Sequence, residues 1–233
     1  MRYLYGTPGS ADEFLQVMRA NADQVAEVMA GRTTHTNEPA RCATLLPVLA
    51  RLPQPSALLE VGAAAGLRLL PDRYAFDYGQ GRIEPSRPTT PDPPLFTCRA
   101  GPEVPLPERN VEAWRAGLDL HPIDLGDESE MRWLEALVWP GEEYRVPRLR
   151  AACEVARADP PRVIAEDLRS DLGELAREAP ADATLVVFHT AVLADVRDAN
   201  ERAAFARSVR QLGAVWIANE APGNSRGSAG GPA

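Results

Sequence analysis

The chain has 233 residues and a net charge of -8, and all 25 of its basic residues are arginine. This length can bury one sizeable core, and an acidic chain without a basic stripe is not expected to bind nucleic acid. Three isolated cysteines and three isolated histidines indicate neither a disulfide framework nor a metal site, and no leader or membrane-spanning run is visible, so we expect a cytoplasmic protein without a metal.

Two helical segments are expected before the first strand. Apolar residues recur at helical spacing over residues 11–31, which end in a glycine, and this pattern predicts a core-facing helix. Asn37 and Glu38 stand before Pro39 in the manner of a helix N-terminus, and the helix that follows is expected to bend at Pro47. Capping accounts for Asn37 and Glu38, and a ligand role is the alternative.

The central feature of the sequence is an apolar run followed by a loop of only Gly and Ala. The run is typical of a buried strand that opens into a tight turn and a short helix over Leu67–Arg73. Small residues stand at Gly62, Ala64 and Gly66, with Glu60 two positions before them. Such a turn lets the backbone approach a ligand, and the helix offers free N–H groups and a positive dipole end. The pattern predicts a nucleotide-type binding loop, with a plain turn between core elements as the alternative.

Strands and helices alternate along the rest of the chain, with one interruption. A strand at Tyr74–Tyr78 is followed by residues 79–108, which are rich in Pro and Gly and are expected to form an ordered surface insertion. Further strands are predicted at Val111–Asp119, Arg162–Asp167, Thr184–Phe188 and Ala214–Ala218. Helices are predicted at Ser129–Val138, Pro147–Ala158, through Leu172 and Leu175, and at Asn200–Leu212. The third of these strands is the most apolar and is expected to be central.

This alternation predicts an α/β fold, a three-layer Rossmann-like sandwich with a mostly parallel sheet. We expect one domain over residues 1–222, with a helical N-terminal part at 11–52, a core at 56–220 and a disordered tail at 223–233. The carboxyl ends of parallel strands meet at one edge of the sheet, where such folds bind ligands. The polar residues expected at strand ends are Glu60, Asp77, Asp119, Asp167, His189 and Glu220.

Stretches beginning at Glu60, Gly117 and Val187 resemble three successive motifs of class I S-adenosylmethionine-dependent methyltransferases. More closely, the chain resembles, from about residue 12 to 222, a bacterial family known as domain of unknown function 2332. The pieces that carry this resemblance are Thr36–Glu38, Glu60–Leu67, Asp72–Tyr74, Gly117–Pro122, Trp139–Pro140, Asp159–Pro161 and Val186–Thr190. The family usually has serine where this chain has Ala64, so a serine hydrolase with its nucleophile at that position is excluded.

The methyltransferase resemblance implies a site for S-adenosylmethionine. It implies that Glu60 and the Gly62–Gly66 backbone hold the methionine end, that Asp119 accepts hydrogen bonds from the ribose, and that Asp167 lies beside the adenine. Asp119 follows Glu60 by 59 residues, whereas a ribose-binding acid ordinarily follows by about 20. Either an insertion separates them, or Asp77, at 17 residues, takes this role.

Two functions are compatible with these motifs. The first is a methyltransferase acting on a small molecule, with His189 as candidate general base or orienting group and a core histidine as the alternative for that residue. The second is a non-catalytic or regulatory Rossmann-like protein that binds a nucleotide-like ligand or a protein partner. Because the last two strands of a methyltransferase sheet are missing, Ala214–Ala218 is expected to be an open apolar edge that favours self-association.

Overall fold

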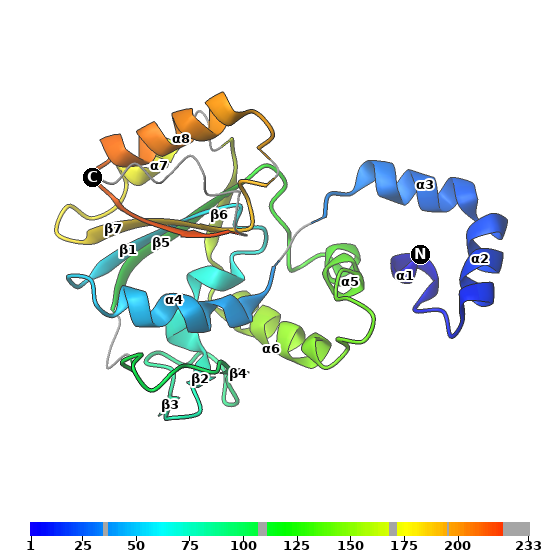
Figure 1. Ribbon diagram of the computed structural model, residues 1–233, viewed down its shortest axis with the longest axis horizontal. Helices are drawn as coiled ribbons and strands as arrows, with labels where there is room; N and C mark the ends of the chain where they lie inside the picture. The colour runs from blue at the N-terminus through cyan, green and yellow to red at the C-terminus, as the bar shows by residue number, and fades with distance from the viewer. Residues whose placement is uncertain (35–36, 107–110, 168–171, 195, 221–233) are drawn as a thin grey trace.

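The computed structural model describes residues 1–34, 37–106, 111–167, 172–194 and 196–220. Its centre is a five-stranded parallel sheet in the order β6-β5-β1-β7-β8, with helices on both faces (Figure 1). The predicted α/β, Rossmann-like three-layer fold is therefore confirmed. The predicted tail at 223–233 lies outside the described residues.

The middle of the sheet is β1 (Ser56–Val61), which is buried along its whole length. Its neighbours are β5 (Glu112–Asp119) and β7 (Thr184–Thr190), and the outer strands are β6 (Arg162–Ala165) and β8 (Val215–Asn219). The prediction that the most apolar strand is central is wrong, because β7 lies second from an edge. In this strand order the chain starts in the middle and builds outward in both directions, which places the first strand at the centre.

Separate hydrophobic layers cover the two faces of the sheet. Because side chains alternate along a strand, Leu58 of β1 packs in the layer of α4 (Cys42–Leu49), whereas Leu59 packs in the layer of α8 (Ala199–Gln211). The short helix α7 (Leu172–Ala176) lies on the same face as α8 (Figure 1). The sheet is thus buried on both sides, as parallel sheets require.

A second, small sheet is inserted in the chain between β1 and β5. Its order is β3-β2-β4, formed by β2 (Ala75–Asp77), β3 (Arg82–Ile83) and β4 (Leu95–Thr97). The buried rings of Tyr74 and Phe96 meet edge to face, with centroids 5.3 Å apart, and join this sheet to the core that α6 (Arg145–Ala158) also covers. The Pro- and Gly-rich segment therefore has a core contact of its own.

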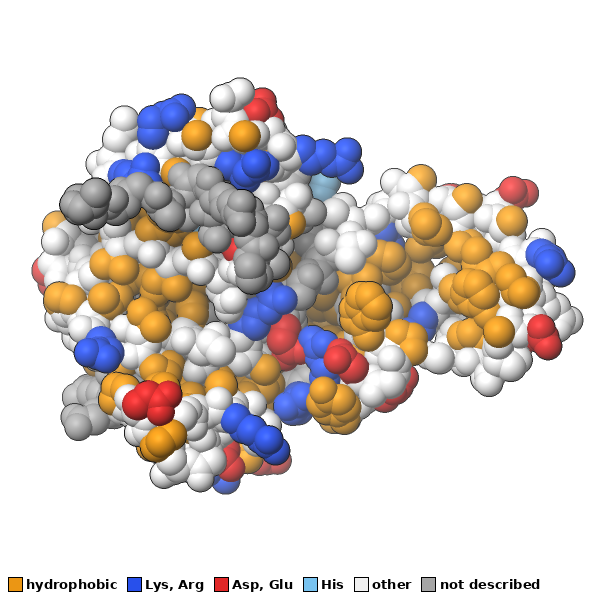
Figure 2. All heavy atoms as spheres, viewed as in Figure 1, with side chains coloured by type: hydrophobic (Ala, Val, Ile, Leu, Met, Phe, Trp, Pro, Cys, Tyr) orange, Lys and Arg blue, Asp and Glu red, His pale blue; other side chains and the backbone are white. Residues whose placement is uncertain are grey.

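The N-terminal segment differs from its prediction. The segment expected to be one core-facing helix forms two helices, α2 (Ala11–Ala20) and α3 (Ala22–Gly31), which project from the sheet body (Figure 1). Only Val25 is buried in them, and Met29 is 70% exposed. Figure 2 shows hydrophobic side chains across the visible surface of this part. The apolar spacing predicts an amphipathic helix correctly, but it does not say what covers the apolar face.

The N-terminal helices meet the body through α1 (Arg2–Tyr5) and α5 (Glu128–Ala136). The Tyr3 hydroxyl is hydrogen-bonded to the Ser129 hydroxyl at 2.8 Å. The Arg32 guanidinium lies 4.8 Å from the Tyr3 ring centroid and also forms an ion pair with α5. Polar and cation–π contacts thus join these helices to the rest of the chain.

Candidate functional site

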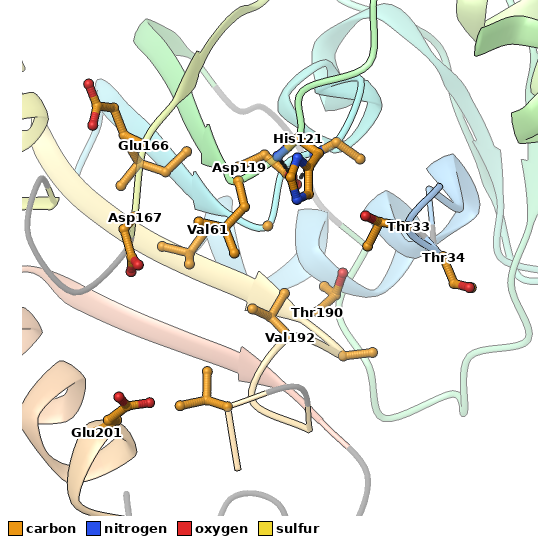
Figure 3. A pocket seen from close by; sticks show the side chains of 16 residues that line it. Thr33, Thr34, Val61, Asp119, His121, Glu166, Asp167, Thr190, Val192 and Glu201 are labelled. Carbon is orange, nitrogen blue, oxygen red and sulfur yellow. Dashed lines mark hydrogen bonds between the residues drawn. The ribbon is translucent and has the colours of Figure 1, made fainter. Parts of the chain in front are cut away.

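A cavity of about 290 Å³ opens at the carboxyl ends of β1, β5, β6 and β7 (Figure 3). Counted along the chain, the main-sheet strands run in the order 3-2-1-4-5, so the order reverses between β1 and β7. Open α/β sheets bind ligands at this reversal, outside the carboxyl ends of the strands. The cavity therefore lies where the fold predicts a ligand site.

The loop after β1 forms one wall of this cavity. Gly62 and Ala64 line it, and both have positive φ angles, of 71° and 52°. A Cβ atom at Gly62 would overlap the Val192 side chain, so this position requires glycine. Gly66, with φ of 69°, lies behind the wall, where a Cβ atom would overlap Pro161. Two of the three predicted loop residues therefore face the cavity, and the third allows a close approach of the chain before β6.

The helix predicted after this loop does not form. Instead, the chain makes two single 3₁₀ turns, η2 (Leu67–Leu69) and η3 (Pro71–Arg73). Pro71 has no N–H to donate to a continuing helix, which explains the break after the first turn. The helix dipole expected behind the loop is consequently missing, and the prediction of Leu67–Arg73 as a helix with a ligand-binding N-terminus is wrong.

Asp119 holds the loop from the neighbouring strand. It ends β5, is 8% exposed and lines the cavity. Its Oδ2 accepts a hydrogen bond from the Ala64 N–H at 2.8 Å, and its Oδ1 accepts one from the His121 N–H at 2.8 Å. The Ala64 bond helps keep a non-glycine residue at positive φ. The structure thus brings Asp119 against the β1 loop, 59 residues from Glu60, because the small sheet is inserted between them.

Asp77 is not brought to the cavity. It ends β2 in the small sheet, and its Oδ1 accepts a hydrogen bond from the Gly79 N–H at 2.8 Å. Asp77 follows Glu60 at nearly the interval expected of a ribose-binding acid, but it lies in the inserted small sheet, so distance along the sequence was misleading.

Glu60 also lies outside the cavity wall. It is completely buried and forms an ion pair with the Arg68 guanidinium. Burial raises the pKa of Glu60 to about 7, although Arg68 opposes this shift. Arg68 also donates from Nη2 to the Gly62 carbonyl at 2.7 Å. The pair therefore supports the loop from beneath, instead of presenting a carboxylate to a ligand.

His189 packs in the hydrophobic layer that α8 covers, next to Phe205 and Trp216. It is fully buried, and the Trp216 indole N–H donates to its Nε2 at 3.0 Å. Because an indole nitrogen only donates, Nε2 must accept, so Nδ1 carries the proton and donates it to the Glu220 carboxylate at 2.7 Å. Although burial raises it, hydrogen bonds from His189 and two backbone N–H groups lower the pKa of Glu220 overall. Both ring nitrogens are thus occupied away from the cavity.

The opposite side of the cavity carries further acids. Asp167 follows β6, Glu201 comes from α8, and both lie across from Asp119 and Thr190 in Figure 3. The Thr190 hydroxyl is buried and has no hydrogen-bond partner among the described residues. Sequence reasoning missed Glu201, because it sits in the first turn of a helix, where an acid is ordinarily explained by the helix dipole.

The charged residues that line this cavity in the described part of the chain are acidic. Four carboxylates line it, from Asp119, Glu166, Asp167 and Glu201, and none of the described lining residues is Arg or Lys. In the described part of the chain, no group of three or more His, Cys, Asp or Glu residues is placed to hold a metal ion. Across the same residues, no helix combines the length and apolarity that a membrane span needs.

A family model described as an uncharacterized protein conserved in bacteria (DUF2332) matches residues 5–232. The chain belongs to the DUF2332 family. This confirms the resemblance to that family that the sequence motifs indicate. No curated protein and no solved structure matches this DUF2332 chain.

Two motifs of this DUF2332 chain brace the cavity loop from below. In the Asp72–Tyr74 motif, the Asp72 carboxylate accepts two hydrogen bonds from Arg115 of β5, at 2.9 and 3.0 Å. Arg73 forms an ion pair with Asp159, which begins the Asp159–Pro161 motif. Pro161 of that motif packs behind the loop. These motifs are therefore explained by the architecture around the site and not by contact with a ligand.

Proposed function

We propose that this protein binds S-adenosylmethionine in the cavity at the sheet edge and methylates a small molecule. The observation that carries this proposal is the position of Asp119, at the carboxyl end of the strand beside β1 and bonded to the β1 loop. In nucleotide-binding sheets of this order, an acid at the end of the second strand accepts hydrogen bonds from the ribose. β5 is the second strand of the main sheet.

Two features favour a nucleoside cofactor without phosphates. The loop after β1 leads into 3₁₀ turns, so it lacks the helix N-terminus that binds pyrophosphate in dinucleotide sites. The described lining contains no Arg or Lys, so it offers no basic side chain to hold the phosphates of NAD or ATP. S-adenosylmethionine has no phosphate, and its sulfonium is positively charged.

The residues present fit this cofactor in named roles. The Gly62 and Ala64 backbone would face the methionine end, Asp119 the ribose and Asp167 the adenine, while the Thr190 hydroxyl offers a buried polar atom without a partner among the described residues. When bound, S-adenosylmethionine supplies a methyl group activated by its sulfonium. Glu60 then acts indirectly, by holding Arg68 under the loop.

Binding without turnover is the second candidate. It is favoured by the positions of His189 and Glu60, since neither reaches the cavity and each is occupied by core contacts. The lack of an assigned general base does not by itself exclude methyl transfer, because an acceptor that is already deprotonated needs none.

The test is calorimetric titration with S-adenosylmethionine, S-adenosylhomocysteine, NAD and ATP. We expect the two adenosyl ligands to bind and the phosphate-bearing ones to bind weakly. Asp119→Asn should weaken binding by about 1.5–3 kcal/mol, the range for a hydrogen bond to a charged group. Asp77→Asn, a matched change in the insertion, should have no effect.

No binding of S-adenosylmethionine at millimolar concentration, or tighter binding of NAD, would reject the proposal. Equal losses in the Asp119 and Asp77 variants would reject the role of Asp119. Release of S-adenosylhomocysteine in the presence of small-molecule acceptors then separates a methyltransferase from a binding protein.

A further inference from the structure

A second cavity, of about 660 Å³, lies beside the first. It is lined by η1 (Pro39–Arg41) and the residues before it, by the end of α5 and the residues after it, by α6 and by Thr97 of β4. Thr34 lines both cavities. The two spaces are therefore neighbours, and the second is not part of the ligand site that the sheet order predicts.

Asn37 is the least explained polar residue in this cavity. It is 8% exposed, and neither Nδ2 nor Oδ1 has a hydrogen-bond partner among the described residues. Capping does not account for it, because Glu38 takes that role and accepts a hydrogen bond from the Ala40 N–H at 3.0 Å. A buried amide without partners is costly, so it indicates a bound group that supplies them.

The cavity also carries an excess of positive charge. Three arginines line it, Arg41, Arg145 and Arg148, against one acid, Glu38, which pairs with Arg145. Arg41 donates only to a backbone carbonyl, and Arg148 lies 5.1 Å from the Tyr144 ring centroid. Within the described chain, neither Arg41 nor Arg148 forms an ion pair with a carboxylate. Burial is the largest cause that lowers the pKa of Arg41; the charges of Arg68 and Arg145 lower it further, while those of Glu38 and Glu220 oppose the shift.

The rest of the wall is apolar and partly aromatic. Leu134, Val138 and Leu149 form the buried part, while Trp139 and Tyr144 stand 73% and 65% exposed. Figure 2 shows basic, acidic and hydrophobic side chains side by side on this face, between the sheet body and the N-terminal helices. Aromatic rings can stack on a planar group, and an arginine without a carboxylate partner can hold its negative charge.

We propose that this cavity binds a small organic anion, a carboxylate or phosphate attached to a planar apolar body. Arg41 and Arg148 neutralise the anion, Asn37 donates to and accepts from its polar groups, and Tyr144 or Trp139 stacks on the planar part. This binding is independent of the neighbouring cavity. That the anion is the methyl acceptor is a second step, which rests on the proposed function.

The first experiment is calorimetric titration of the full chain, without S-adenosylmethionine. The probes are 4-hydroxyphenylacetate and phenyl phosphate, with neutral 4-hydroxyphenylacetamide as their control. We expect at least one anion to bind about tenfold more tightly than the amide, and Arg148→Gln to remove this preference. Arg150→Gln, on the same helix but outside the cavity and paired with Glu135, should leave it unchanged.

Absence of any preference for the anions, or the same effect in the Arg148 and Arg150 variants, would overturn the proposal. Because the titration contains no cofactor, its outcome does not depend on the first cavity. A second titration, with S-adenosylmethionine present, tests the acceptor role alone. If the anion binds but the two ligands exclude each other, the binding site stands and the acceptor role is lost.

Asn37→Leu separates a binding role from a structural one. Because the amide lacks partners, the leucine variant should have an unchanged or higher urea midpoint, while its affinity for the anion falls by about tenfold or more. A lower midpoint, together with unchanged anion binding by the folded protein, would show that Asn37 serves the fold and would overturn its assignment.

Discussion

At the residue scale, the Glu60–Arg68 ion pair is a buried charged contact that supports the cavity loop. Glu60 is completely buried and Arg68 is 3% exposed, so water compensates little of their charge. Removing one partner of such a pair typically costs about 3–5 kcal/mol, because the other charge is left buried. Because Arg68 also donates to the Gly62 carbonyl, breaking the pair should disturb the conformation of the loop as well.

This pair predicts a pH dependence of stability. Burial raises the pKa of Glu60 to about 7 in the folded protein, so the folded chain binds this proton more tightly than the unfolded chain does. The stabilisation from this bound proton is therefore fully present below the pKa of Glu60 in the unfolded chain, about 4.3. It is lost as the pH rises through the pKa of Glu60 in the folded chain.

The measurement is urea unfolding of the wild type and of Glu60→Gln, which has no proton to lose. The free energy of unfolding of the wild type relative to the variant should fall by about 2–3 kcal/mol between about pH 5 and about pH 8. Parallel stability curves for the two proteins over that interval would contradict the prediction.

At the element scale, α2 and α3 show an apolar face without a large core contact. Phe14 is 40% exposed and Leu15 is 45% exposed, whereas Val25 is 3% exposed. An exposed apolar side chain contributes little to stability, because its surface stays in water on folding.

We therefore expect Met29→Ser to change the free energy of unfolding by less than about 0.5 kcal/mol, as surface substitutions do. On the same helix, Val25→Ala should cost about 1–3 kcal/mol, since it removes buried methyl groups. Urea unfolding of the two variants checks this. Equal costs would mean that another surface covers Met29 in solution.

At the scale of the whole molecule, β8 is the outer strand on one side of the main sheet. It pairs with β7, and no second strand partner occurs among the described residues. Val215, Trp216 and Ile217 are only half-buried. An apolar outer strand with unpaired backbone groups favours pairing with another chain.

We predict a dimer formed through this edge. The Asn219 carbonyl accepts a hydrogen bond from Ala191, next to β7, so alternate residues of β8 turn their backbone groups inward and the Ala218 N–H faces outward. Ala218→Pro removes that N–H and should abolish the dimer while the fold is kept. Light scattering after size-exclusion chromatography measures the mass. A stable wild-type monomer whose outward-facing Trp216 and Ala218 amides exchange rapidly would contradict this prediction.

Much of the candidate site could be anticipated from strand ends. Asp119 and Asp167 were expected at the edge where parallel strands finish, and the Gly62–Gly66 loop was expected beside them. The structure places Asp119, Asp167, Gly62 and Ala64 in the cavity wall. Thr33, Glu201 and the neighbouring cavity around Asn37 could not be inferred, because they depend on segments that are distant in sequence and meet only through packing.

By itself, the sequence determined the α/β class, the five strands of the main sheet and the family, because apolar patterns and short motifs are local properties of a chain. Tertiary structure decided which strand is central, how little covers the apolar faces of α2 and α3, and which polar strand-end residues face the cavity. Glu60 and His189 stand at strand ends, as expected, but their side chains are bonded to Arg68 and Trp216 in the core and do not line the cavity. These partners are set by tertiary packing, which local sequence patterns do not predict.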